Sequence, residues 1–270
     1  MRCAVAAFAI MDAAMKQLAA SYPPLQVASL RALSSLPFLL AALAWKGAWR
    51  DLRVHRPWLH LVRGLLGVAM LSTFVYAVSR MSLANTYALY LCAPLLVTAL
   101  SVPMLGASVP ASRWIAILVG FGGVLIVLRP TGSSVISVAG LVAAASAVCY
   151  ALGMVTISIL GKTDSKRAMV FWFVSAMAVG AGLLAIPRWQ PIAVRHLPIL
   201  ALIGVMGAFG QYFITEAFSR APPHVVAPFE YTAIVWAFGL DWLFWQVLPR
   251  QMLLPHLVRR IKVLEIGVKL

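Results

Sequence analysis

Charge of either sign is scarce in this sequence. Only 11% of the 270 residues are charged, whereas 63% are hydrophobic, and the mean hydropathy is +0.94. A soluble domain is typically about a quarter charged and about half apolar. The composition therefore excludes an ordinary soluble domain and predicts an all-α integral membrane protein, with the lipid bilayer as its surroundings.

Acidic residues are the scarcest of the charged residues. Seven Asp and Glu stand against 22 Lys and Arg, which gives a formal net charge of +15. In a membrane protein, such an excess usually marks cytoplasmic loops, which are enriched in Lys and Arg. We therefore interpret the basic residues as loop residues and expect no nucleic-acid partner.

The sequence also lacks the common signatures of metal, cofactor and catalytic sites. Its three cysteines have no motif spacing and its five histidines do not cluster, so we expect no disulfide, no metal site and no cofactor. It has no nucleotide-binding loop, which leaves ATP-driven transport by this chain unsupported. No arrangement of nucleophile, acid and base suggests an enzyme.

Long apolar runs are what the sequence does contain. About 20 mostly apolar residues cross a bilayer as a helix, and nine such spans are predicted, at 3–20, 27–45, 61–79, 84–104, 114–128, 138–160, 169–187, 197–217 and 224–246. With the N-terminus in the cytoplasm, the inner regions hold eleven Lys and Arg and the outer loops five. The positive-inside rule therefore predicts a cytoplasmic N-terminus.

An internal repeat divides the chain into halves. The pattern Ala-x-Ser-Arg at 77–80 recurs 140 residues later at 217–220, and each copy precedes an apolar stretch with an internal proline. This offset predicts one repeat at 1–130, a second at 131–250 and an atypical basic tail at 251–270, where a tenth helix is not recognisable. Five helices per repeat would give the copies opposite orientations, a plan that places a binding site near the membrane midplane between them.

Two acidic residues stand out in the apolar stretch 219–249. Glu230 and Asp241 are eleven residues apart, close to three helical turns, so an α-helix would place both on one stripe. Acidic side chains at membrane depth usually face a bundle interior or a water-filled cavity. Glu230 lies between Pro228 and Tyr231, where an acid, a phenol and free backbone groups would meet. For Asp241, exposure at the outer interface is an adequate alternative.

Charged residues also fall in the first two spans. Asp12 and Lys16 are four residues apart and share a helical face, as either a structural ion pair or a binding pair. Arg31, just inside the second span, would either snorkel to the interface or bind a carboxylate of the substrate.

Aromatic residues offer a further set of candidates. The tyrosines Tyr90 and Tyr231 and the tryptophan Trp236 would either line a pocket or serve as packing and belt residues.

Several stretches together resemble EamA-type transporters of the drug/metabolite transporter superfamily. They are FAIMDAAMKQLAASYPPLQVASLRAL, SLANTYALYLCAPLLVTALSVPMLG, RWIAILVGFGGVLIVLRP, GLVAAASAVCYAL and APFEYTAIVWAFGLDWLFWQVLP. The resemblance implies ten helices in two inverted five-helix repeats, and transport of small metabolites across the bacterial inner membrane, often as export. The sequence departs from the family pattern in three places. Ala107 stands where the family usually has a glutamate, Gln246 stands at the matching position of the second half, and the tail has no recognisable tenth helix.

We therefore expect a secondary transporter that exports a small organic metabolite by alternating access, with Asp12, Lys16, Arg31 and Glu230 near the substrate. One alternative is an uptake permease for a vitamin or nucleoside-like cofactor. Another, motivated by the tail, is a truncated, transport-inactive homologue or one part of a heteromeric membrane assembly. A homodimer is left open.

Overall fold

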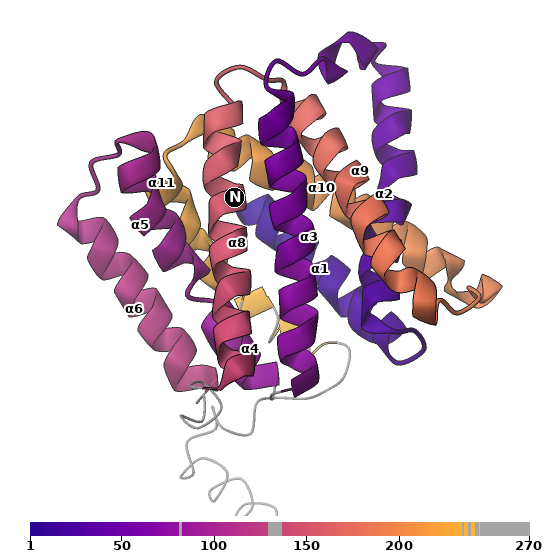
Figure 1. Ribbon diagram of the computed structural model, residues 1–270, viewed down its shortest axis with the longest axis horizontal. Coiled ribbons are helices and arrows are strands. Elements are labelled where there is room, and N and C mark those ends of the chain that lie inside the picture. The colour runs from indigo at the N-terminus through magenta and orange to yellow at the C-terminus, as the bar shows by residue number, and fades with distance from the viewer. Residues whose placement is uncertain (81–82, 129–136, 234, 237–238, 241–242, 244–270) are drawn as a thin grey trace, which may run out of the picture.

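The computed structural model describes all residues except 81–82, 129–136, 234, 237–238, 241–242 and 244–270, and the regular elements of this described part are all helical (Figure 1). They are α1 (Arg2–Ala19), α2 (Pro24–Trp45), η1 (Ala48–Leu52), α3 (Pro57–Arg80), α4 (Leu83–Tyr90), α5 (Ala93–Leu105), α6 (Ala111–Leu128), α8 (Val138–Leu160), α9 (Lys166–Ala185), η2 (Ile186–Arg188), η3 (Val194–His196), α10 (Leu197–Arg220), α11 (Pro223–Val226) and η4 (Ala227–Thr232), where η marks a 3₁₀ helix.

Local sequence signals set several helix ends. Pro24 and Pro57 open α2 and α3, where the missing N–H of proline costs nothing. The hydroxyls of Ser137 and Ser165 accept hydrogen bonds from the first turns of α8 and α9. Gly106 ends α5 with a φ of 64°, a left-handed conformation that favours glycine.

The first eight predicted spans coincide with α-helices. Six described segments are long and apolar enough to cross a membrane: Pro24–Trp45, Pro57–Ala77, Asn85–Leu105, Val138–Leu160, Lys166–Arg188 and Val194–Arg220. A shorter apolar helix covers Ala111–Ile126. Helix α1 carries Arg2, Asp12 and Lys16 within its 18 residues, so it is more polar than the other predicted spans.

Two predicted spans differ from continuous α-helices. The fourth is divided at residues 91–92 into α4 and α5, directly before Pro94, because proline cannot donate the next helical hydrogen bond. The ninth opens as the short α11 and continues as the 3₁₀ helix η4, with Pro228 inside it. Since a 3₁₀ helix has three residues per turn, the predicted stripe that joins Glu230 to Asp241 is not supported at Glu230. Asp241 and the tail at 251–270 lie outside the described residues.

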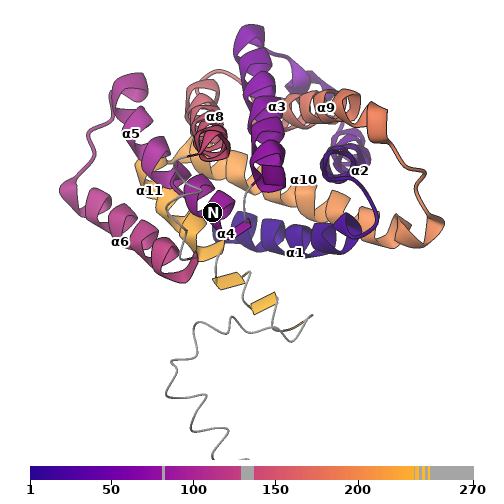
Figure 2. The same cartoon turned by 60° about the horizontal axis from the view of Figure 1, so that its bottom comes forward.

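Helices far apart in the sequence form the main contacts. α1 packs on α10, α2 on α9 and α3 on α8, while α2 also contacts α10 and α3 also contacts α9. α4 and α5 pack against the other side of α8, and α6 lies at the edge beside α4 and η4 (Figures 1 and 2). The bundle therefore consists of α1–α3 interleaved with α8–α10, with α4–α6 attached beside α8.

Glycine permits the closest of these helix contacts. A Cβ atom added at Gly204 of α10 would lie 2.2 Å from the Ser34 carbonyl oxygen of α2, and one added at Gly64 of α3 would lie 2.7 Å from the Ala176 Cβ of α9. A side chain at either position would force the backbones apart. Small residues at helix interfaces serve the same purpose in other membrane bundles.

We predict that Gly204→Ala destabilises the protein by about 1–3 kcal/mol, the usual cost of overpacking a close contact. Gly122→Ala in α6 is the matched control, because an added Cβ there meets nothing within 4 Å; alanine should be neutral or gain up to about 1 kcal/mol. Thermal unfolding of the purified protein in detergent measures both. Equal melting temperatures for the two variants would show that the close α2–α10 contact does not limit the stability of the protein.

Candidate functional site

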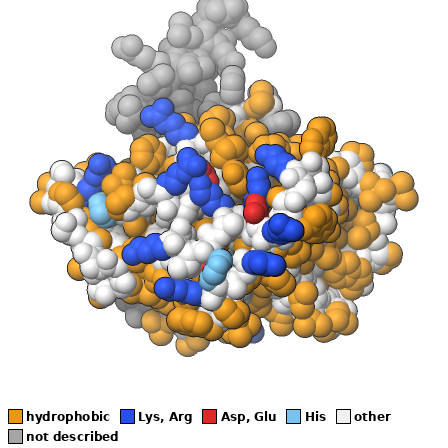
Figure 3. Space-filling view, turned by 90° about the horizontal axis from the view of Figure 1, so that it is seen from above, with side chains coloured by type: hydrophobic (Ala, Val, Ile, Leu, Met, Phe, Trp, Pro, Cys, Tyr) orange, Lys and Arg blue, Asp and Glu red, His pale blue; other side chains and the backbone are white. Residues whose placement is uncertain are grey.

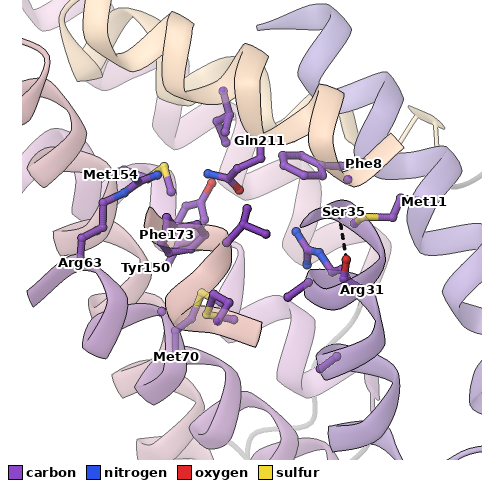
Figure 4. Close-up of a pocket in the computed structure, with 18 of the residues that line it drawn as sticks. Phe8, Met11, Arg31, Ser35, Arg63, Met70, Tyr150, Met154, Phe173 and Gln211 are labelled. Carbon is purple, nitrogen blue, oxygen red and sulfur yellow. Dashed lines mark hydrogen bonds between the residues drawn. The ribbon is translucent and has the colours of Figure 1, made fainter. Parts of the chain in front are cut away.

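A central cavity of about 220 Å³ lies among α1, α2, α3, α8, α9 and α10, and Tyr90 of α4 completes its wall (Figure 4). Its polar lining residues include Asp12, Arg31, Ser35, Arg63, Tyr90, Tyr150 and Gln211. Phe8, Phe173 and several methionines form the apolar wall. Gly153 of α8 helps to leave this space open, since a Cβ added there would meet no atom within 4 Å.

Asp12 and Arg31 lie together at the cavity. Asp12 is exposed, and it is one of the residues that line the cavity. The positive charge of Arg31 attracts its carboxylate. The guanidinium of Arg31 also lies over the Phe8 ring, with its central carbon 5.4 Å from the ring centroid. The Ser35 hydroxyl donates a 2.9 Å hydrogen bond to the Arg31 carbonyl (Figure 4). An acidic and a basic side chain thus line the cavity from two helices, α1 and α2.

Lys16 is exposed and is not among the cavity-lining residues. In the cavity, the cation that faces Asp12 is Arg31. The predicted Asp12–Lys16 pair stays a prediction, and Lys16 itself is one turn away from the cavity.

Tyrosines connect the cavity to Glu230. The Tyr90 and Tyr150 rings have centroids 5.5 Å apart, and the Tyr90 hydroxyl lies 3.8 Å from the Met70 sulfur. The Tyr150 hydroxyl faces the carboxyl of half-buried Glu230, whose Oε1 has no hydrogen-bond partner in the described part of the chain. Glu230 therefore lies behind the cavity wall, in contact with it through Tyr150.

The remaining predicted residues lie away from the cavity. The Tyr231 ring packs on Gly120 of α6, where an added Cβ would be 2.5 Å from its Cδ2. Trp236 is 44% exposed. Neither residue lines the cavity.

Arg63 was not among the predicted site residues. It lies near the start of the predicted span 61–79 and was counted only as one of the basic residues of the inner regions. Arg63 belongs to α3 and is only 1% exposed. Its Nη1 donates a 2.6 Å hydrogen bond to the Met169 carbonyl, and its guanidinium carbon lies 4.4 Å from the Phe173 ring centroid. Without Arg63 the predicted inner regions still hold ten basic residues against five, so the expected orientation is unaffected. Pro57, a typical first residue of a helix, is the signal that could have shown that α3 begins before the predicted span, so that Arg63 lies well inside the helix.

Gln211 was missed as well. It is 6% exposed and lines the cavity from α10, and its Nε2 is buried without a hydrogen-bond partner in the described part. The neighbouring glycines Gly204, Gly207 and Gly210 lie where α10 approaches other helices most closely. Their close contacts place α10 against α1 and α2, and so bring Gln211 to the cavity.

One end of the bundle is held by a polar cluster between the α2–α3 and α8–α9 connections. Arg167 pairs with Asp51, and the Ser165 hydroxyl donates to the Asp51 carbonyl at 2.5 Å. Asp164, whose side chain is fully buried, accepts a 2.6 Å hydrogen bond from the His55 backbone N–H. We call these five residues the basic-end cluster. Figure 3 shows Lys and Arg side chains gathered around it.

The opposite end has a cluster without carboxylates. Gln26 exchanges hydrogen bonds of 2.6 and 2.9 Å with the backbone of Gln190, and the Tyr22 hydroxyl is 2.7 Å from Nδ1 of His196. These contacts join the α1–α2 turn to the α9–α10 connection. We call these four residues the glutamine-end cluster. Contacts therefore join the two groups of helices at both ends of the bundle.

Comparison with known proteins identifies the family. The profile of the EamA-like transporter family matches residues 1–129. The chain is 32% identical over 247 residues to the pseudopaline exporter CntI of Pseudomonas aeruginosa, covering 90% of this chain and 85% of the relative. The chain belongs to the EamA-like transporter family. It is accordingly a multi-pass membrane transporter, and the predicted family and all-helical fold class are confirmed.

Other members of the family have different named solutes. A riboflavin transporter of Rhizobium johnstonii is 29% identical, over 80% of this chain and 70% of the relative. An S-adenosylmethionine uptake transporter of Rickettsia prowazekii is 26% identical, over 84% and 76%. A crystal structure with 21% identity shares the fold with a TM-score of 0.73, covering 90% of this chain and 88% of the other.

The basic-end cluster predicts a pH dependence of stability. Burial alone would raise the pKa of Asp164, but hydrogen bonds from the His55 N–H and the Thr163 hydroxyl outweigh it and hold the pKa below its ordinary value of 3.8. A carboxyl with a lowered folded-state pKa stabilises the fold above the unfolded value and loses that contribution as the pH falls through the folded one. Thermal stability in detergent should therefore decline as the pH drops through and below about 3.8.

Asp164→Asn should flatten this acid decline and cost about 1–3 kcal/mol at neutral pH, since it disturbs buried hydrogen bonds. Asp51→Asn is the matched control: Asp51 is 42% exposed, and an exposed pair contributes at most about 1 kcal/mol. If Asp164→Asn retained the full acid decline, Asp164 would not be its source.

Proposed function

We propose that this chain is a secondary transporter that moves a small organic solute through the central cavity by alternating access. The observation that carries the proposal is the cavity itself, in which Asp12 and Arg31 face the interior of a membrane bundle. Charged side chains at membrane depth are costly and usually mark the path of a substrate or ion. The aromatic and methionine wall would contact the apolar part of the same solute.

The packing order supports the proposed inverted repeats, 1–130 and 131–250. Suppose that α1, α2 and α3 of the first half correspond to α8, α9 and α10 of the second. Exchanging the halves then turns the α3–α8 contact into the α10–α1 contact, which is observed. It likewise turns the α2–α10 contact into the observed α9–α3 contact. The α2–α9 contact maps onto itself. Each main contact therefore has a partner under one exchange of halves, as alternating access by inverted repeats requires.

The two end clusters are candidates for the gates. Both join α1–α3 and their connections to the segments around α8–α10, so each would have to open in turn to expose the cavity to one side. The excess of Lys and Arg around the basic-end cluster supports a cytoplasmic position for that end. On that basis the N-terminus is cytoplasmic and the membrane is the bacterial inner membrane.

Export is the direction we propose, because the relative with 32% identity is named as an exporter. Uptake is the second candidate, favoured by the uptake transporter for S-adenosylmethionine among the relatives. Sided vesicles distinguish the two. Inside-out vesicles from cells that express the chain accumulate the solute if it is exported, and right-side-out vesicles accumulate it if it is taken up.

We predict that Asp12→Asn and Arg31→Gln each lower transport at least about tenfold, because each removes a charge from the cavity. The measurement is solute counterflow in proteoliposomes, screened over a metabolite panel that includes riboflavin and S-adenosylmethionine. Arg50→Gln, an exposed arginine of η1, is the control and should transport normally. Normal counterflow by both cavity variants would contradict the proposed site.

Glu230 is the candidate proton carrier, as an acid next to the cavity-lining Tyr150. We predict that Glu230→Gln abolishes the stimulation of transport by a pH gradient while leaving counterflow within about twofold, because counterflow needs no net proton movement. Glu216→Gln is the control, since Glu216 is paired with Lys166 and Arg220 at the basic end. If Glu230→Gln still responds fully to the gradient, another group couples transport.

A further inference from the structure

Arg63 is a buried cation to which the proposed function assigns no role. It lines the cavity but is only 1% exposed, and two of its three side-chain nitrogens, Nε and Nη2, are buried without a hydrogen-bond partner in the described part of the chain. An arginine in such surroundings is normally paired, since desolvation of a charge is costly. The cavity wall therefore contains an unsatisfied guanidinium.

The contacts that Arg63 does make hold it in place. Nη1 donates to the Met169 carbonyl at 2.6 Å, and the face of the guanidinium lies against the Phe173 ring. The two unsatisfied nitrogens lie on one edge of the planar group, and their N–H bonds run parallel. This edge matches the two oxygens of a carboxylate, which arginine binds in bidentate fashion.

The described acidic residues are engaged elsewhere. Asp51 pairs with Arg167, and Glu216 pairs with Lys166. Asp164 accepts a hydrogen bond from the His55 backbone N–H. Its Oδ1 lies 3.9 Å from Nε2 of His60, which precedes Arg63 by about one helical turn. Asp12 faces Arg31 and Glu230 faces Tyr150, so none of the five described carboxylates is within ion-pair distance of Arg63.

Arg63 and Arg31 lie on opposite sides of the same cavity (Figure 4). We infer that the transported solute carries two carboxylates, one bound by Arg31 and the other by the free edge of Arg63, with an amino group at Asp12. The solute class is thus a small amino dicarboxylate whose acidic groups are separated by a short chain. This inference rests on the proposed function, and it specifies the solute that the cavity accepts.

Binding to the purified protein in detergent tests the inference directly. The probes are 2-aminoadipate, 2-aminopimelate and 2-aminosuberate, each compared with its own ω-amide, which has the same shape without the second charge. We expect at least one diacid to bind about tenfold more tightly than its amide. Arg63→Gln should reduce that preference to within about twofold.

Two further variants control for folding and for general charge. Arg63→Lys keeps the charge but has no bidentate edge, so it should keep part of the preference. Arg56→Gln removes an exposed arginine just before α3 and should keep all of it. If Arg63→Gln does not purify as a monodisperse protein, Arg63→Lys and the wild-type comparison of acid with amide decide. The inference is overturned if the wild type binds no diacid more tightly than its amide, or if a folded Arg63 variant keeps the full preference.

Counterflow in proteoliposomes separates this inference from the proposed function. Transport of other metabolites with no preference for the second carboxylate would overturn only the inference about Arg63. Preferential binding of a diacid without transport of any solute would instead overturn the proposed transport function and support the Arg63 site.

Discussion

The close pairing of α1–α3 with α8–α10 is the constraint on which the rest of the structure depends. It requires backbones to meet without side chains between them, as at Gly204 against Ser34 and Gly64 against Ala176. Between these contacts, α8 turns Gly153 toward unoccupied space, and the cavity lies there. The cavity is thus the place where tightly interleaved helices do not quite fill their shared interior, rather than a cleft between two separate domains.

The five described carboxylates lie in two different electrostatic surroundings. Each described carboxylate has its own structural place: Asp51, Asp164 and Glu216 hold the basic end, whereas Asp12 and Glu230 lie at or next to the cavity. Asp51 and Glu216 pair with Lys and Arg at partly exposed positions, where an ion pair contributes little, and the buried Asp164 is held by hydrogen bonds. Asp12 and Glu230 lie at membrane depth, where an isolated charge is expensive. The same residue type therefore joins connections at one end of the bundle and lines or adjoins the cavity at another level.

The sequence predicted features that depend on composition along the chain and failed where spatial neighbours decide. The first eight apolar runs coincide with α-helices, although the fourth is divided before Pro94. Length and hydropathy suffice to locate such helices in a membrane. Pro94 and Pro228 were noted, but the 3₁₀ geometry at Glu230 was not foreseen, so the stripe argument did not hold there. Arg63, near the start of the predicted span 61–79, was counted only as a basic residue of the inner side. No sequence pattern could show that Met169 and Phe173, more than a hundred residues away, enclose it.

The proposed repeats are alike in packing and unequal in chemistry, and this inequality bears on how the transporter would work. Asp12, Arg31, Arg63 and Tyr90 all come from the first half, whereas the second half contributes neutral groups such as Tyr150 and Gln211 to the cavity. A solute held by its charges would therefore stay with the first half while the second half moves past it. The affinity of the protein for the solute would then change little between the two access states. It would change if Glu230, the described acid next to the cavity from the second half, altered its interaction with Tyr150 as the halves move. Glu230 is therefore the residue through which a proton would affect the release of the solute without contacting it.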